Sequence, residues 1–237
     1  MAMMRRLVLL MLVGVIGGCT PHQGGMRPGP RWPSEVSVPN GPGREPTYGN
    51  TASGSVASRG DHETDGAGPL GVIPRQQWTQ HRARPGSVNA MNGINRITVH
   101  HEGWEQVYYT GYAKTAQRLE RIRHSHVNNH GWGDIGYHFV VDRAGRVWEA
   151  RDLRYQGAHV SDHNKHNVGV MVLGNFQEQY PSQEQLRGLE QFLGKLMRRY
   201  NVAASRVYTH RELGQTSCPG QHLQPKLDAW RRNGRLR

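Results

Sequence analysis

Residues 208–220 have the sequence YTHRELGQTSCPG and place His210 eight residues before Cys218. Thiolate and neutral imidazole are zinc ligands, and three protein ligands with one open position are typical of a catalytic zinc site. The apolar run Ile97–His101 predicts a buried strand, and His100 near its end is the candidate third ligand. A metal held this way joins a loop to a strand and should stabilise the fold. The alternative is a packed core cysteine with a surface histidine, because 14 histidines make a chance pairing easy.

Several short motifs accompany the three candidate ligands. In chain order they are VHH (99–101), DIGYHF (134–139), GAH (157–159), NVGV (167–170), HRE (210–212) and TSCPG (216–220). In this order and spacing the set resembles the zinc N-acetylmuramoyl-L-alanine amidases of the peptidoglycan recognition protein and amidase-type phage lysozyme superfamily. The resemblance covers about residues 72 to 225.

The resemblance implies a zinc hydrolase that cleaves the amide bond between the lactyl group of N-acetylmuramic acid and L-alanine. Zn²⁺ supplies a nucleophilic water and a Lewis acid for such chemistry. Tyr137 stands where catalytic members place a tyrosine facing the zinc water, and Thr216 stands where members carry a lysine or threonine that steadies the tetrahedral intermediate. Without the resemblance, Tyr137 is a half-buried strand residue and Thr216 an ordinary loop hydroxyl.

One position departs from part of the family. Relatives of the cytoplasmic muropeptide-amidase type carry a glutamate base on the strand where this chain has Met171. A mechanism based on Tyr137 and Thr216 is therefore favoured. His101 and His159 are candidate bases or substrate contacts, or polar residues at the rim of the site.

A second class of function stays open, namely a non-catalytic lipoprotein that binds peptidoglycan, as do family members that have lost a metal ligand. The presence of all three ligands favours the enzyme. The expected partner is peptidoglycan or a muropeptide, and the protein is expected to act as a monomer.

The N-terminal segment predicts export. Arg5 and Arg6 precede an apolar run that is too short to span a bilayer, so residues 1–18 are interpreted as a signal peptide. The sequence IGGC (16–19) resembles a lipoprotein box, which would make Cys19 the lipidated residue that anchors the protein in the membrane. Thr20 rather than aspartate follows, which favours the outer membrane, periplasmic face, if the host has one. The alternative is a plain secretory signal with an incidental cysteine.

Composition divides the remainder of the chain. Residues 19–69 are rich in Gly, Pro and Ser without apolar periodicity and predict a flexible tether, whereas residues 70–237 are long enough for one domain. With Cys19 lipidated and Cys218 on the metal, neither of the two cysteines remains for a disulfide. The formal net charge of +12 suits an anionic polymer or lipid surface, and export argues against nucleic acid.

The apolar pattern of this domain predicts an α/β fold with a central mixed sheet flanked by helices. The resemblance implies the same architecture, with the zinc in a surface groove. The expected strands are 97–101, 137–142, 146–150, 168–173 and 206–208, with a hairpin turn at 142–145. The expected helices are 113–129, one that begins at the capping box of Ser182 and Gln185, and one with Pro225 in its first turn. In the first helix, Arg118 is expected on the solvated face.

Overall fold

A computed structural model describes residues 70–236 of the 237-residue chain. The predicted signal peptide, Cys19 and the tether up to residue 69 lie outside the described residues and stay predictions. Within residues 70–236, no helix is long and apolar enough to cross a membrane.

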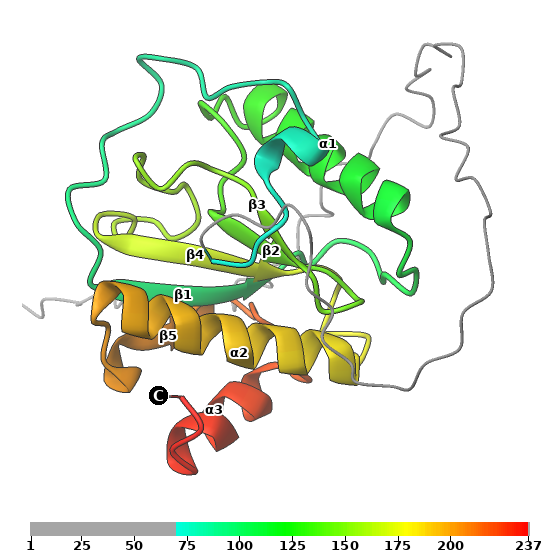
Figure 1. Cartoon of the computed structure of the whole chain (residues 1–237), viewed down its shortest axis with the longest axis vertical. Helices are drawn as coiled ribbons and strands as arrows, with labels where there is room; N and C mark the ends of the chain where they lie inside the picture. Colours follow the sequence, from blue (N-terminus) through cyan, green and yellow to red (C-terminus); the bar gives the residue numbers. More distant parts are fainter. Residues whose placement is uncertain (1–69, 237) are drawn as a thin grey trace, which may run out of the picture. The chain divides into compact units, whose positions relative to one another are not determined.

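Five strands form one mixed sheet in the order β3-β2-β4-β1-β5 (Figure 1). The strands are β1 (Arg96–His101), β2 (Phe139–Val141), β3 (Val147–Glu149), β4 (Asn167–Val172) and β5 (Val207–Thr209). All neighbours pair in parallel except β2 and β3, which form an antiparallel hairpin. The predicted mixed sheet is confirmed, and each predicted strand ends within two residues of the observed one.

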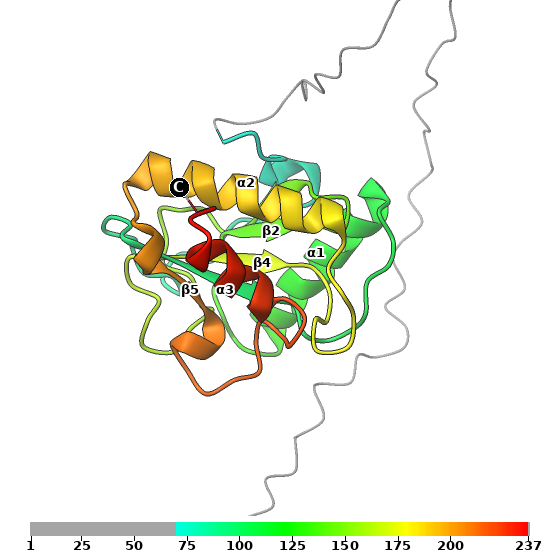
Figure 2. The same cartoon turned by 90° about the horizontal axis from the view of Figure 1, so that it is seen from below.

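Three α-helices cover the two faces of this sheet. They are α1 (Tyr112–Asn128), α2 (Gln183–Tyr200) and α3 (Gln224–Arg232). Figures 1 and 2 show α1 on one face, and α2 with α3 on the other. The predicted capping box starts α2, because Ser182 Oγ accepts a hydrogen bond from Gln185 N at 3.0 Å and Gln185 Oε1 accepts one from Ser182 N at 3.1 Å.

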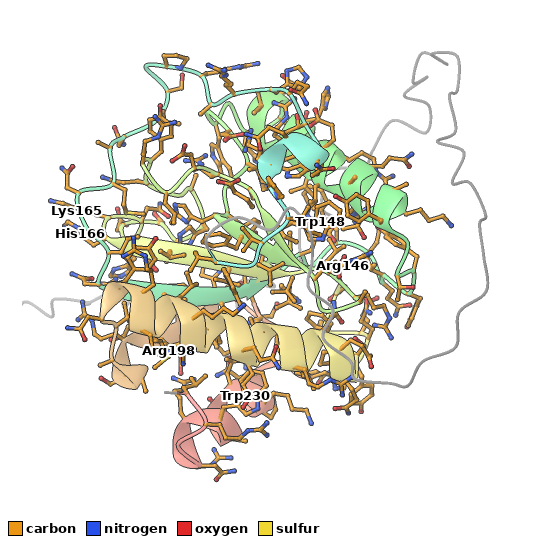
Figure 3. All side chains as sticks on the ribbon, in the orientation of Figure 1. Arg146, Trp148, Lys165, His166, Arg198 and Trp230 are labelled. Atoms are coloured by element: carbon orange, nitrogen blue, oxygen red, sulfur yellow. The ribbon has the colours of Figure 1, made fainter. Side chains whose placement is uncertain are left out.

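The sheet face that α2 and α3 cover carries the larger apolar core. Ile97 and Val99 of β1 point into it, together with alternate residues of β4 and the inward side chains of both helices. Figure 3 shows Trp230 lying between α3 and α2, where it is almost fully buried. Since β4 is buried on both faces, its sequence is a continuous apolar run without alternation.

The core on the α1 face covers only part of the sheet. Its buried members come from α1, β2, β3, β4 and the loops, and none of those described belongs to β1 or β5. Side chains alternate along a strand, so Thr98 and His100 point to this face of β1. The part of the sheet that α1 leaves uncovered is therefore where His100 lies.

Candidate active site and metal centre

The structure brings together the three predicted ligands. His100 lies near the end of β1, His210 begins the short 3₁₀-helix η3 (His210–Glu212), and Cys218 follows in the next loop. One ligand atom from each residue lies within 4.8 Å of the other two. His100 Nδ1 is 3.7 Å from Cys218 Sγ, and the rings of His100 and His210 have centroids 4.7 Å apart.

Backbone contacts hold His210 in place. Glu212 Oε2 accepts hydrogen bonds from the backbone N of Thr209 at 2.6 Å and from its hydroxyl at 3.0 Å, which forms a cap around the first turn of η3. The other carboxylate oxygen of Glu212 pairs with Arg231 of α3 at 2.7 Å. Glu212 thus joins the segment that carries His210 to the last helix.

Two other contacts return the loop to the strand. The backbone N of Arg211 donates to the carbonyl of Cys218 at 2.9 Å, which closes the loop on itself. The backbone N of His101 donates to Cys218 Sγ at 3.4 Å, so the sulfur lies against the end of β1. This bond holds the sulfur at the strand end that carries His100.

A chain of hydrogen bonds fixes the tautomer of His100. His159 Nε2 lies 3.3 Å from the carbonyl oxygen of Asn167, which can only accept, so Nε2 of His159 carries the hydrogen. His159 Nδ1 then accepts from Nε2 of His100 at 3.0 Å. Burial, followed by neighbouring histidines, lowers the pKa of both rings well below 6.5 and keeps them neutral. The lone pair on Nδ1 of His100 is therefore left for a metal ion.

The other two candidate histidines, His101 and His159, lie on different sides of the sheet. His159 is only 7% exposed and lies behind His100, where it contacts the ligand. His101 points to the opposite face of the sheet, where Nδ1 accepts from the backbone N of Phe176 at 3.1 Å and the rings lie 6.3 Å apart. Burial lowers the pKa of His101 to about 4.

Tyr137 lies beside the ligand cluster, with its ring centroid 5.2 Å from that of His100. Burial, then Cys218 and Glu102, raise the pKa of the phenol, so it keeps its proton at neutral pH. The residue before it is fixed by His126 of α1, whose Nδ1 accepts from the backbone N of Gly136 at 3.1 Å. This contact of His126 was not predicted from the sequence.

Thr216 lies on the loop that carries Cys218. Its Oγ1 accepts a hydrogen bond from the backbone N of Cys218 at 3.2 Å, which leaves the hydroxyl proton free to donate elsewhere. Met171 is completely buried beside His100 in the register of β1 and β4. The position at which some relatives carry a carboxylate base is thus an apolar core position here.

The cluster has the ligand chemistry of a zinc site, and one of its ligand separations is close to that of tetrahedral Zn²⁺. Tetrahedral Zn²⁺ with Zn–N of about 2.0–2.1 Å and Zn–S of about 2.3 Å separates its ligand atoms by about 3.5 Å. The 3.7 Å between His100 Nδ1 and Cys218 Sγ is close to that value. Burial raises the pKa of the Cys218 thiol to about 12, so its thiolate needs a cation as counter-charge. The three residues therefore fit Zn²⁺.

The prediction that Arg118 lies on the solvated face of its helix is wrong. It is 1% exposed, and its Nε donates to Glu102 Oε1 at 2.6 Å while Nη1 donates to Glu105 at 2.8 Å. Glu102 directly follows the two strand histidines, and its Oε2 has no hydrogen-bond partner among the described residues. The physical reason is that two carboxylates from the loop after β1 form ion pairs with the buried guanidinium. The sequence did indicate this burial, because Arg118 stands four residues before the buried Ile122 and thus on the same side of α1.

The mixed sheet, with two histidines and a cysteine gathered at the end of β1, defines an α/β domain with a candidate zinc site. Residues 90–221 match the Amidase_2 family, described as N-acetylmuramoyl-L-alanine amidase. This chain belongs to that family.

The individual relatives share less than a third of the aligned residues with this chain. The chain is 32% identical over 165 residues to an N-acetylmuramoyl-L-alanine amidase of Sus scrofa, which covers 68% of this chain and 27% of that protein. It is 26% identical over 160 residues to peptidoglycan-recognition protein SC2 of Drosophila melanogaster, with 67% and 85% covered. A solved complex of peptidoglycan recognition proteins LCa and LCx with tracheal cytotoxin has 28% identity and a TM-score of 0.61, with 67% and 95% covered. The chain thus spans about a quarter of the mammalian amidase.

Proposed function

We propose that this protein is a zinc-dependent amidase that hydrolyses the bond between the lactyl group of N-acetylmuramic acid and L-alanine in peptidoglycan. The observation that carries the proposal is the cluster of His100, His210 and Cys218, whose ligand atoms lie within 4.8 Å of one another. Family membership supports the same chemistry. The solved relative with bound tracheal cytotoxin, a monomeric diaminopimelic acid-type peptidoglycan, supports peptidoglycan as the partner.

Different side chains of the site have different roles in the reaction. A zinc ion at this site supplies Lewis acidity and a nucleophilic water for attack on the amide carbonyl. Tyr137 keeps its proton and donates a hydrogen bond as negative charge develops on the carbonyl oxygen. Thr216 has a free hydroxyl proton for the same purpose, since its oxygen is fixed by the backbone N of Cys218. Met171, which pairs with His100 in the register of β1 and β4, cannot act as a base.

A second candidate is a non-catalytic peptidoglycan-binding protein. The similarity to a recognition protein of Drosophila melanogaster favours it. The complete ligand set favours the enzyme, because a binding protein has no need of an open metal position.

The proposed location rests on the sequence alone. The N-terminal run and Cys19 indicate an exported lipoprotein, held in the outer membrane with the domain on the periplasmic side where the host has that membrane. Removal of residues 1–18 takes away Arg5 and Arg6 and no acidic residue, which lowers the formal net charge from +12 to +10, and such a basic chain suits peptidoglycan as an anionic polymer. We propose that the protein acts there as a monomer.

Zinc content and reaction products test the function together. The purified protein should contain one zinc per chain by elemental analysis, and digestion of purified cell walls should release stem peptides with a free L-alanine amino group. Cys218→Ala is the control and should release none. Binding of cell walls without any peptide release would establish the second candidate.

A further inference from the structure

Two tyrosines stand out on the surface near the end of the sheet that carries the site. Tyr108 is 62% exposed and Tyr180 is 69% exposed, and Tyr112 at 40% is the remaining large exposed apolar residue among residues 70–236. Exposed aromatic side chains that gather in one place mark interaction sites. We define the tyrosine ledge by the four residues Tyr108, Arg143, Tyr180 and His222.

We propose that the tyrosine ledge binds the sugar rings of a glycan strand beside the metal site, so that the preferred substrate is polymeric peptidoglycan and not a released fragment. The inference rests on the proposed amidase function for its substrate, whereas glycan binding by the ledge is independent of catalysis.

Contacts of side chains and backbone connect the four residues in a row. The rings of Tyr180 and His222 have centroids 3.9 Å apart. The guanidinium of Arg143 lies 5.1 Å from the ring centre of Tyr108, and its Nη1 donates to the carbonyl of Tyr180 at 3.4 Å. Arg143 therefore bridges the two tyrosines, which come from different loops.

Buried polar contacts hold these loops in a fixed arrangement. Gln179 is 2% exposed, and its amide donates to the carbonyl of Val107 at 2.9 Å while its Oε1 accepts from the backbone N of Val107 at 2.6 Å. Ser182 Oγ donates to the carbonyl of Arg143 at 2.7 Å. Figure 1 shows the loop after β1, the β2–β3 turn and the start of α2 at the same end of the sheet. A fixed surface loses little conformational entropy when it binds.

The ledge is continuous with the metal-binding loop. His222 follows Cys218 by four residues, and its backbone N donates to the carbonyl of Phe176 at 3.0 Å. The backbone N of Phe176 donates in turn to His101, the neighbour of the ligand His100. The fully buried Phe176 thus connects the ledge to the end of β1.

The chemistry of the ledge suits a chain of sugars. Aromatic rings pack against the C–H faces of pyranose rings, and polar groups at their edges bond the hydroxyls and N-acetyl groups. Gln106 and Glu178 supply such groups, with their side chains 3.4 Å apart, and Tyr108 OH donates to Gln106 at 3.3 Å. A stem peptide at the metal is attached to one sugar of the strand, so the next sugars are presented alongside. A released monomer lacks these neighbours.

Binding to glycan strands freed of stem peptides tests the ledge without any need for amidase activity. The full chain and its Tyr108→Ala/Tyr180→Ala variant are compared by co-sedimentation or calorimetry, and the variant should bind about tenfold more weakly. Tyr112→Ala removes an exposed tyrosine outside the ledge and should bind as the wild type does. Equal affinity of the double variant and the wild type, or no binding by either, overturns the proposal.

The substrate preference has its own measurement. Turnover of intact cell walls by the double variant should fall about tenfold, with turnover of a soluble monomeric muropeptide unchanged within about twofold. Equal losses on both substrates overturn the preference for polymer. If the wild type cleaves neither substrate, the proposed amidase function fails, and the glycan-binding comparison still decides whether the ledge binds sugars.

Discussion

His159 Nδ1 lies 3.0 Å from Nε2 of His100, on the other side of the imidazole ring from the sulfur of Cys218. This contact makes His159 a positioning residue for the metal site. It holds the hydrogen of His100 on Nε2 and leaves Nδ1 as the donor atom for a metal ion.

Replacing His159 should weaken metal binding without removing a ligand. We expect His159→Leu to lower zinc affinity about 10–100-fold, because the tautomer and the ring orientation of His100 are no longer fixed. His159→Gln should lose less, since its amide can accept from His100 and donate to Asn167. Competition with a zinc-binding dye measures both. Equal zinc affinity of His159→Leu and the wild type would contradict the positioning role.

Loss of Cys218 should abolish turnover and lower the melting temperature. Cys218→Ala removes the ligand that joins the loop to the end of β1, so the free energy of metal binding no longer stabilises the fold. Thermal unfolding with and without a chelator measures the second effect, which should be absent in the variant. Thr216→Ala keeps all three ligands and should have the smaller effect on both quantities. Full zinc occupancy and turnover in Cys218→Ala would show that another ligand set operates.

Tyr137→Phe tests the mechanism separately from the metal. The variant keeps the ring beside His100 but lacks the hydroxyl that donates in the transition state. We expect kcat to fall about 10²–10³-fold, or about 2.7–4 kcal/mol, with little change in KM. Steady-state kinetics with zinc analysis of the same sample measure this. A near-normal kcat with zinc bound would leave Tyr137 as a wall of the site.

Stability should fall as the pH drops below neutral. His138 is completely buried, with Nε2 donating to the carbonyl of Tyr155 at 3.0 Å and Nδ1 accepting from the backbone N of Gly169 at 2.9 Å. Burial lowers its pKa from 6.5 to about 4, and lowers that of His126 to about 3. The folded-state pKa lies below the unfolded value, so below pH 6.5 the unfolded state binds more protons. Stability is therefore lost progressively as the pH falls from 6.5, the pKa of the unfolded state, to about 4, the pKa of the folded state.

Denaturant titrations in the presence of a chelator exclude the contribution of metal loss. Between about pH 7 and about pH 5, His138 should account for about 2 kcal/mol of lost unfolding free energy. His138→Gln cannot titrate and should show a correspondingly smaller pH dependence. Glu102 acts in the opposite direction, since burial, opposed by Arg118, raises its pKa to about 6. An identical pH dependence in the wild type and His138→Gln would show that His138 does not carry the effect.

Cys19→Ala should move the protein from the membrane to the soluble fraction of lysed cells. No helix within residues 70–236 could serve as a second membrane span. Fractionation followed by immunodetection measures the change. Retention of the variant in the membrane would point to the basic surface or to an uncleaved signal.

The sequence predicts most of the fold because its strongest patterns are local. The continuous apolar run of β4 and the capping box of Ser182 each identify an element without reference to the remainder of the chain. The ligand set could be predicted because the spacing of His210 and Cys218 is matched by a family motif. The predicted ends of the strands were less accurate, because pairing stops where a neighbouring strand stops.

The parts that could not be predicted depend on which groups meet in space. Alternation along β1 places His100 and His101 on opposite faces, but only the position of His210 and Cys218 in space shows which of the two belongs to the site. The contact of His159 with His100 depends on the path of a loop. The burial of Arg118 depends on carboxylates that lie 13 and 16 residues earlier in the chain.

The carboxylate of Glu212 gives α3 a direct mechanical connection to the metal centre. One oxygen contacts Thr209, the residue before the ligand His210, and the other contacts Arg231. A displacement of α3 is therefore transmitted through the side chains of Arg231 and Glu212 to the residue before a ligand, without deformation of the sheet. A molecule that shifts α3 would alter zinc affinity, and bound zinc would in turn oppose that shift by the same free energy.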